Sequence, residues 1–461
     1  MNSHTVLTAM LPEHLLLLGI VLLIGIEIAG PWRRASLAVA LACVGAAAYA
    51  AIGLSLDGYA ATPFAGQFSV DPATLLAKGM VLAFALPVLL MSRDEFADGE
   101  FAVLLLSSLY GVCLMQSADS FLVLFLGLEL MSLPVYVLVL LAYRRPQSAE
   151  AALKYLVLGG TATATFLMGA SLLYGTTGSM AIDTFASALG SGDNLARAAV
   201  VLVILAFFLK AAIVPFHAWA PDAYEGASVP VTAYMATVVK AGVLLAVVRL
   251  FGEAMLASPM LELIAVLPLV SIVWGNLTAM GQQSFRRMIA YSSIAHAGYL
   301  FYALLGDPAG RMQAVVFYVL AYGLLNLLAF AALPTAAEDG ERDRLDNLKG
   351  LFHRAPFAAL MIGIAMLSLA GIPPFPGFVA KFLIFKNVMA AGHIEYAVLG
   401  LVGSYLGIYF YLRVIQFMFM SPDAKVAGQG NARRFALAAS VGCVAAALLL
   451  TVMPGWVIAG L

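Results

Sequence analysis

The sequence predicts an all-α polytopic membrane protein with about fourteen transmembrane helices. Hydrophobic residues make up 63% of the 461 residues, charged residues make up only 11%, and the mean hydropathy is +0.98. Soluble domains average roughly 25% charged residues, so this composition excludes a soluble fold. Apolar stretches of about 20 residues, which is the length that crosses a bilayer as a helix, recur between polar or Pro/Gly breaks.

These stretches place the spans in chain order. They cover residues 11–29, 35–56, 72–92, 100–117, 120–143, 150–178, 198–220, 228–254, 259–281, 287–306, 311–336, 355–385, 394–420 and 435–460. The first span is followed by others, so we expect a retained helix and not a cleaved signal. The stretch 355–385 is long for one span, which predicts an interruption at its GIPPFPG sequence, residues 371–377.

Positive charges give the orientation. Fourteen Lys and Arg residues fall in the odd-numbered loops, whereas Arg197, Arg311 and Lys386 are the three in the even-numbered loops. Because cytoplasmic loops are enriched in Lys and Arg, the odd loops are expected inside and both termini in the periplasm. The richness in Ala, Gly and Leu favours bacterial coding, and hence the bacterial cytoplasmic (inner) membrane.

A short internal repeat relates two spans. Ala211-x-Ile213-x-Pro215-Phe216 in the seventh span recurs as Ala370-x-Ile372-x-Pro374-Phe375 in the twelfth. Five spans separate the copies, and an odd offset predicts an inverted-topology repeat that pairs spans 4–8 with spans 9–13. We therefore divide the chain into a three-helix segment (1–98), two repeats (99–257 and 258–421) and a C-terminal helix (422–461).

Prolines interrupt both copies of this repeat. Proline removes a backbone donor and clashes with the preceding turn, so Pro215 in one copy, and Pro373, Pro374 and Pro376 in the other, predict broken helices. Broken helices at membrane depth usually line transport sites.

Three ionisable side chains lie deep in apolar sequence: Glu129, Lys210 and Lys240. A lysine at the centre of a bilayer costs about 2.5–3.5 kcal/mol on insertion scales, so it needs a partner or a water-filled cavity. We expect Glu129 to pair with Lys210 or Lys240. Such a pair can work as a proton switch, because a small change in separation shifts the protonation of a desolvated lysine. The alternative is a static ion pair that holds helices in register.

Further titratable groups continue this set. Lys381 follows the second break and is expected to serve the exit to the outside, and His296 can relay protons at physiological pH, with Ser292 and Ser293 one turn earlier. His296 is equally suited to helix packing, and Lys154, near a span end, to snorkelling.

Other ionisable residues are secondary candidates. His217 follows the first break and is suited to capping exposed carbonyls, and Arg413 is a permanent charge suited to orienting water or to structural pairing. We interpret Glu27 and Lys78 as contacts between helices, outside the pathway.

Cofactor sites are not indicated. Neither GxxxxGK[ST] nor GxGxxG occurs in a strand-turn-helix context. Cys43, Cys113 and Cys443 have no metal-ligand spacing, so no metal site is expected. The net charge of -1 gives no nucleic-acid footprint. We expect this chain to move ions without a redox centre of its own.

With these residues assembled, the chain resembles the antiporter-like membrane subunits of respiratory complex I and their relatives in Mrp antiporters, over residues 100–420. The motifs that carry the resemblance are LGLELMSLPVYVL, KYLVLGG, LKAAIVPFHAWAPDAYEGASVPV, YSSIAHAGYL and GIPPFPGFVAKF. The motif YSSIAHAGYL, and lysine instead of glutamate at position 381, are most similar to the subunit N type. GIPPFPGF is richer in proline than the Gly-Ile-Pro pattern of the family.

The resemblance implies a proton-translocating subunit of NADH:quinone oxidoreductase. It implies that Glu129 and Lys210 form the coupled pair, Lys240 the central relay and Lys381 the connection to the far side. NADH, FMN, iron–sulfur clusters and quinone are then expected in partner subunits. The expected partners are the antiporter-like subunit M, small subunits such as K and J, and the lipid bilayer.

Two other functions stay open on the sequence. One is an Mrp-type cation/proton antiporter subunit, or a membrane subunit of a related hydrogenase complex. The other is a membrane scaffold, in which the buried charges serve packing only.

Overall fold

The structure is a computed structural model that describes residues 3–30, 35–93, 95–96, 99–142, 146–256, 260–333, 343–421 and 434–455. Over these residues it has twelve helices long and apolar enough to cross a membrane, and two shorter apolar helices, Glu100–Gln116 and Pro356–Ala370. Each of the fourteen predicted spans overlaps one of these helices, so the all-α polytopic fold is confirmed. The predicted spans also include residues 143, 259, 334–336 and 456–460, which lie outside the described residues.

The chain divides into two compact units. Unit 1 comprises Met1–Ala212 and Gly226–Leu263, and unit 2 comprises Ile213–Glu225 and Ile264–Leu461. The predicted four-part division stays a prediction.

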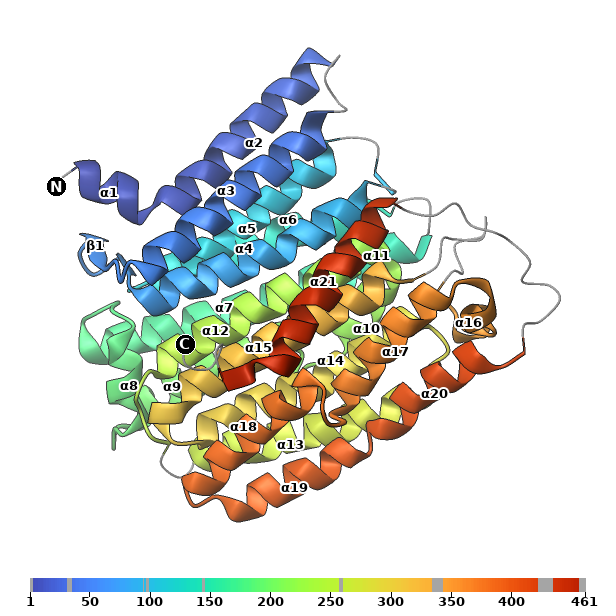
Figure 1. The fold of residues 1–461 in the computed structure, drawn as a ribbon. Helices are drawn as coiled ribbons and strands as arrows, with labels where there is room; N and C mark the ends of the chain where they lie inside the picture. The colour runs from blue at the N-terminus through green and yellow to red at the C-terminus, as the bar shows by residue number, and fades with distance from the viewer. Residues whose placement is uncertain are drawn as a thin grey trace. The chain divides into compact units, whose positions relative to one another are not determined.

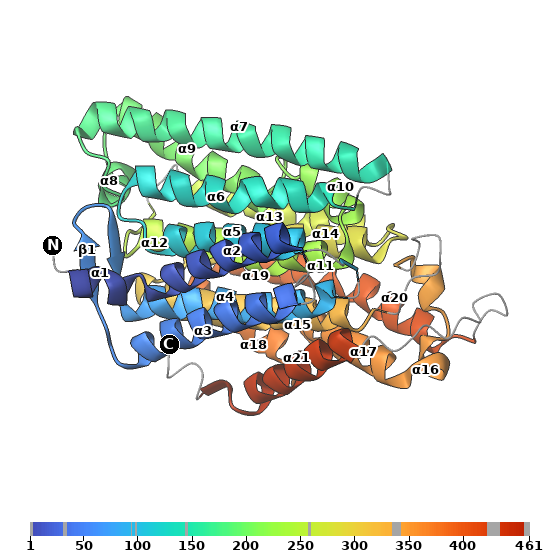
Figure 2. The same cartoon turned by 90° about the horizontal axis from the view of Figure 1, so that it is seen from above.

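Unit 1 is a helical bundle with one small hairpin. Its helices are α1 (Ser3–Ala9), α2 (Leu11–Ala29), α3 (Ser36–Leu56), α4 (Pro72–Ser92), α5 (Glu100–Gln116), α6 (Phe121–Leu140), α7 (Pro146–Thr177), α8 (Asp183–Leu189), α9 (Asn194–Ala211), α11 (Val229–Tyr234), the π-helix η2 (Met235–Val239) and α12 (Lys240–Phe251). The strands β1 (Ala61–Phe64) and β2 (Phe68–Val70) pair antiparallel. Helix α5 packs against α2 and α6, and α7 packs along α9 (Figures 1 and 2).

Local sequence explains where these helices begin. The Asp71 side chain accepts from the backbone of Thr74, whose hydroxyl accepts from the Asp71 backbone, which forms a capping box at the start of α4. The Ser120 hydroxyl caps α6 by accepting from the backbone N–H of Val123. An 18-residue window of the span Val229–Phe251 consists entirely of buried residues.

Unit 2 contains the remaining helices. They are α10 (Trp219–Gly226, all but its last residue), α13 (Met260–Ala279, from Ile264 onward), α14 (Phe285–Tyr302), η3 (Ala303–Leu305), α15 (Pro308–Ala331), η4 (Leu345–Leu348), α16 (Leu351–Arg354), α17 (Pro356–Ala370), α18 (Pro376–Ala390), α19 (Ile394–Tyr405), α20 (Ile408–Phe419) and α21 (Arg434–Val452). Helix α15 contacts α17, α18 and α21, and α21 runs along it in Figure 1.

Both predicted broken helices are present. Helix α9 ends at Ala211, and Ala212 takes the left-handed conformation with φ 61° before the chain reaches α10. Helix α17 ends at Ala370, and Gly371 takes the same conformation with φ 83° before α18. Positions 212 and 371 follow the matched alanines of the internal repeat directly, so the two copies share a backbone feature as well as a motif.

The prolines lie after these helix ends. The left-handed residue ends each first half-helix, Pro215, Pro373 and Pro374 lie in the connecting segments, and Pro376 is the first residue of α18. Proline is favoured at that position because its missing N–H has no helical partner there and its φ is already helical. Two further irregularities had no prediction: the π-helix η2, and the break at residues 406–407 between α19 and α20.

Candidate functional site

Lys210 and Glu129 form a loose ion pair inside unit 1. Lys210 lies one residue from the end of α9, and its Nζ is 3.5 Å from Oε1 of Glu129 on α6. The two side chains are 6% and 23% exposed. Nζ also donates to the hydroxyl of Ser132 at 3.1 Å, and the hydroxyl of Thr163 donates to Glu129 Oε1. A tight charged hydrogen bond measures about 2.7–2.9 Å, so the ammonium is shared between carboxylate and hydroxyl without being locked to either.

Lys240 lies in the same unit, directly after the π-helix. It is the first residue of α12 and is 7% exposed. Two hydrogen bonds fix this span on α5: Tyr234 donates to Ser108 at 2.8 Å, and Gln116 donates to the carbonyl of Gly242 at 2.9 Å. Short π-helical turns are rare and frequent at functional sites, because they change which side chain faces the interior.

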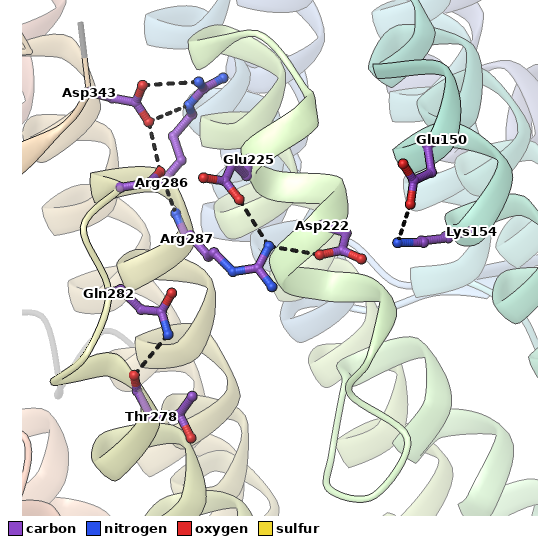
Figure 3. Close-up of polar contacts among 10 residues, drawn as sticks. Glu150, Lys154, Asp222, Glu225, Thr278, Gln282, Arg286, Arg287 and Asp343 are labelled. Atoms are coloured by element: carbon purple, nitrogen blue, oxygen red, sulfur yellow. Dashed lines mark hydrogen bonds and ion pairs between the residues drawn. The ribbon is translucent and has the colours of Figure 1, made fainter. Parts of the chain in front are cut away.

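Lys154 lies on an exposed face of α7. Its side chain is 44% exposed, and its Nζ is 2.6 Å from Oε1 of Glu150, one turn earlier (Figure 3). This is an ordinary i,i+4 surface pair. The geometry agrees with the snorkelling interpretation, and a pathway role for Lys154 stays a prediction.

His296 is buried in unit 2 among tyrosines. The hydroxyl of Tyr318 on α15 is 2.7 Å from Nδ1, and the hydroxyl of Tyr411 on α20 is 3.0 Å from Nε2. Tyr411 is also 2.5 Å from the hydroxyl of Ser292, one turn before His296 on α14. The ring of Tyr322 packs on the imidazole, with centroids 4.7 Å apart.

Lys381 is held at the second broken helix. It is 7% exposed, and its Nζ donates to the carbonyl of Ala370 at 3.1 Å and to the hydroxyl of Ser404 at 3.0 Å. A cation at a helix C-terminus is stabilised by the helix dipole, here that of α17. The Tyr299 ring lies 5.2 Å from Nζ, and its hydroxyl accepts from Asn276 at 3.0 Å.

The two secondary candidates make local contacts in unit 2. His217 Nε2 accepts from the indole of Trp274 at 3.2 Å. Arg413 donates to the carbonyls of Met280 and Gln282 at 2.7 and 3.3 Å, so it satisfies carbonyls that follow the end of α13. The structural role fits Arg413 better than the orienting of water.

Sequence reasoning missed three kinds of polar residue. It gave no partner for Lys78, which forms a 2.6 Å pair with Glu13 between α4 and α2, with both side chains fully buried. It did not identify Ser404 or the tyrosines around His296 and Lys381 as candidate site residues, because such residues in apolar helices are typical of packing. It counted Arg286 and Arg287 only as loop charges.

Those two arginines anchor the start of α14 (Figure 3). Arg287 Nη1 lies 2.7 Å from Asp222 and 2.9 Å from Glu225, both on α10, and Arg286 forms a two-point contact with Asp343 at 2.8 and 3.0 Å. Burial raises the pKa of Asp343, but the charge of Arg286 and hydrogen bonds from Arg286 and Ser284 outweigh it and hold that pKa below its usual value. The helix that carries His296 is therefore fixed to α10 and to the segment at Asp343.

Within the described parts of the chain, no group of three or more His, Cys, Asp and Glu side chains is placed to hold a metal ion. Each unit gathers groups that can gain or lose protons: an amine–carboxylate pair and a second amine in unit 1, and an imidazole, hydroxyls and an amine in unit 2.

Comparison with known proteins identifies the family. Residues 118–407 match the family described as NADH:quinone oxidoreductase/Mrp antiporter, TM. The NADH-quinone oxidoreductase subunit N of Pelobacter propionicus is 40% identical over 426 residues, which is 92% of each chain. This chain belongs to that family, in its subunit N group.

Two solved structures agree on the fold. A chain in the structure titled respiratory complex I from Thermus thermophilus with bound Aureothin superposes with a TM-score of 0.84 at 34% identity, over 97% of this chain and 98% of that one. A chain of the Mrp complex from Dietzia sp. superposes with a TM-score of 0.83 over 98% and 96%, but at 23% identity, which shows the shared fold alone.

Proposed function

We propose that this chain is the proton-translocating subunit N of a NADH:quinone oxidoreductase, and that its buried Glu, Lys and His side chains carry the protons. Glu129, Lys210 and Lys240 are the carriers of unit 1, and His296 and Lys381 are those of unit 2. The observation that carries the proposal is the loose Lys210 pair, because its ammonium is shared between Glu129 and Ser132 beside a broken helix.

The loose pair works as a switch. A carboxylate close to a buried lysine favours the ammonium, and desolvation without that carboxylate favours the neutral amine. Movement of Glu129 towards Lys210 loads a proton on the amine, and movement away releases it to the next carrier. A tight, fully satisfied pair would resist that change.

Lys381 is the outward carrier in this proposal. It lies one turn after its break, and its ammonium is held by a carbonyl and a hydroxyl, which leaves it free of a fixed negative partner among the contacts described above. We assign the side of the break on which Lys381 lies to the outside of the membrane. The assignment rests on the distribution of Lys and Arg between the loops, which puts both termini in the periplasm of a bacterial inner membrane.

The redox chemistry belongs to other subunits in this proposal. NADH, FMN, the iron–sulfur clusters and quinone are assigned to partner subunits of the complex. Subunit M and small membrane subunits such as K and J are the proposed neighbours. Conformational change driven by quinone reduction then alters the Glu129–Lys210 separation.

Lys210→Ala in the assembled complex tests the proposal. In inverted membrane vesicles we expect NADH oxidation and proton pumping to fall together, by at least about tenfold, because one carrier is lost. Lys210→Arg is expected to be as defective, since a guanidinium does not release its proton. Lys386→Ala, on the exposed face of α18, is the matched control.

Normal pumping by Lys210→Ala would refute the assignment. Sodium-dependent proton exchange without NADH would instead favour an Mrp-type antiporter, which the same family model includes.

A further inference from the structure

We propose that Tyr411 is a further proton-carrying residue of unit 2, which moves protons by one turn of α14 between His296 and Ser292. This inference rests on the proposed function, because it takes His296 as a proton carrier. Its basis is an unbroken line of hydrogen bonds: Tyr318, His296, Tyr411 and Ser292.

The first step of the argument is burial. The exposed fractions are 1% for Tyr318, 3% for His296, 1% for Tyr411 and 0% for Ser292. Buried polar groups are costly unless they are hydrogen-bonded, and in this line each member is satisfied by its neighbour. The sequence separation of 115 residues between His296 and Tyr411 means that the fold itself brings them together.

The second step is the geometry of the bridge. Ser292 and His296 are four residues apart on α14, so they share one helix face and are separated by about 6 Å along the axis. The Tyr411 hydroxyl, from α20, is 2.5 Å from Ser292 Oγ and 3.0 Å from His296 Nε2. One oxygen therefore spans a full turn of α14, towards the end that carries Arg286 and Arg287.

The third step is the chemistry of the imidazole. A neutral imidazole has one donor nitrogen and one acceptor nitrogen. The line therefore has two directions. In one, Tyr318 donates to Nδ1, Nε2–H donates to Tyr411, and Tyr411 donates to Ser292. In the other, every hydrogen bond points the opposite way.

Passage of one proton converts the first direction into the second. A proton arrives at the Tyr318 oxygen as the Tyr318 hydroxyl proton passes to Nδ1. The proton on Nε2 passes to the Tyr411 oxygen, the Tyr411 hydroxyl proton passes to Ser292, and Ser292 releases its own. Each of the four groups gains one proton and loses one, so none is left charged. The next passage requires the hydroxyls to rotate and the imidazole to return to the tautomer that is protonated at Nε2.

The chain offers a matched control for Tyr411. Tyr322 touches the same imidazole, but through its ring, with centroids 4.7 Å apart. Tyr322→Phe therefore removes a buried hydroxyl beside His296 while the line from Tyr318 to Ser292 is kept. Tyr411→Phe removes the bridging oxygen and keeps the ring.

The test measures proton pumping by the assembled complex in inverted vesicles. We expect Tyr411→Phe and Ser292→Ala each to lower the pumping rate at least about tenfold, and the double variant to be no slower than Tyr411→Phe alone, because the two residues act in series. Tyr322→Phe is expected to stay within about twofold of the native rate. A Tyr411→Phe complex that pumps within twofold of the native rate overturns the inference.

Lys210→Ala in the same assay separates this inference from the proposed function. Loss of pumping in Lys210→Ala with normal pumping in Tyr411→Phe refutes only the role of Tyr411. Normal pumping in Lys210→Ala refutes the proposed function itself.

A second measurement covers a Tyr411→Phe complex that fails to assemble. Fluorinated tyrosines with increasingly acidic phenols, placed at position 411, keep the ring and the hydroxyl. We expect the pumping rate to change steadily with phenol acidity at position 411 and to stay constant in the same series at position 322. A constant rate at position 411 would mean that the hydroxyl serves structure only.

Discussion

Individual side chains show how this protein keeps charge inside a membrane. Lys210 is shared between Glu129 and Ser132, and Lys381 is held by a backbone carbonyl and Ser404. Neither lysine has the tight contact to a carboxylate that a purely structural ion pair needs to repay its desolvation. We infer that these contacts are tuned for exchange of protons more than for stability.

Glu129 provides a test at this scale. Glu129→Gln keeps the shape of the side chain but removes its charge, so Lys210 loses the partner that favours the ammonium. We expect Glu129→Gln to lower the pumping rate by at least about tenfold. Glu129→Asp should keep part of the activity, because its carboxylate is retained and lies only one methylene further from Lys210. The measurement is the rate of proton uptake by inverted vesicles on addition of NADH. Equal rates for Glu129→Gln and the native complex would remove Glu129 from the pathway.

At this scale the sequence predicts which charged side chains are buried, but it does not predict which residues they contact. An isolated Lys or Glu in an apolar stretch is conspicuous, so Glu129, Lys210, Lys240 and Lys381 could all be found from their bilayer cost. Tyr411 could not, because a tyrosine in YFYLRVIQF is typical of a packed helix and its contact with His296 spans 115 residues. Glu13 was passed over because it lies near the start of its span, where a carboxylate usually reaches water.

The helices are joined by ion pairs that serve packing. Glu13 and Lys78 are fully buried and 2.6 Å apart between α2 and α4. Breaking a buried pair leaves one uncompensated charge, whereas replacing both partners with neutral groups often restores stability. The pair therefore fixes the register of these helices, and removal of one partner should be worse than removal of both.

A double-mutant cycle checks this. We expect Glu13→Gln and Lys78→Met each to destabilise the subunit by about 3–5 kcal/mol, and the double variant to be clearly more stable than either. The measurement is the thermal unfolding of the purified complex. Effects that simply add would show that the two side chains do not interact.

The contact between Arg286 at the start of α14 and Asp343 makes the stability of this region depend on pH. The pKa of Asp343 is held below its usual value by Arg286, so the folded state gains stability that is fully present above about pH 3.9, the usual pKa of an aspartate, and is lost as pH falls through the lower folded value. We expect the backbone at 343–350 to stay protected from hydrogen exchange from neutral pH to about pH 4.5 and to lose protection below pH 3.9.

Asp343→Asn is the control for this prediction. The variant should show reduced protection already at neutral pH, with little further change on acidification. A native protein whose exchange at 343–350 rises steadily between pH 7 and pH 5 would contradict the assignment.

The sequence predicts that these two helices are broken, but it does not predict the backbone conformation at each break. The prolines of LKAAIVPF and GIPPFPGF indicate interruption, because proline lacks the donor that a continuous helix needs. The residues that end the half-helices are Ala212 and Gly371, however, and left-handed backbone at an alanine has no reliable sequence signal. The π-helix before Lys240 has none either, since Met235–Val239 read as ordinary apolar helix.

At the scale of the whole molecule, the chain consists of two units that each contain a set of buried titratable groups. Unit 1 has Glu129, Lys210 and Lys240, and unit 2 has His296 and Lys381. The sequence motif at 211–216 recurs at 370–375, and its interpretation as a mark of two repeats stays a prediction. The match to the NADH:quinone oxidoreductase/Mrp antiporter family covers residues 118–407 and so includes all five of these side chains.

The number of protons moved per NADH tests the central claim most directly. It should be measured in proteoliposomes that contain the assembled complex with Lys240→Met, which keeps an unbranched side chain one atom shorter and removes the titratable amine. If buried amines carry the protons, the variant complex will move fewer protons per NADH, or will oxidise NADH at least about tenfold more slowly. A complex that oxidises NADH at the native rate with an unchanged proton ratio would contradict it.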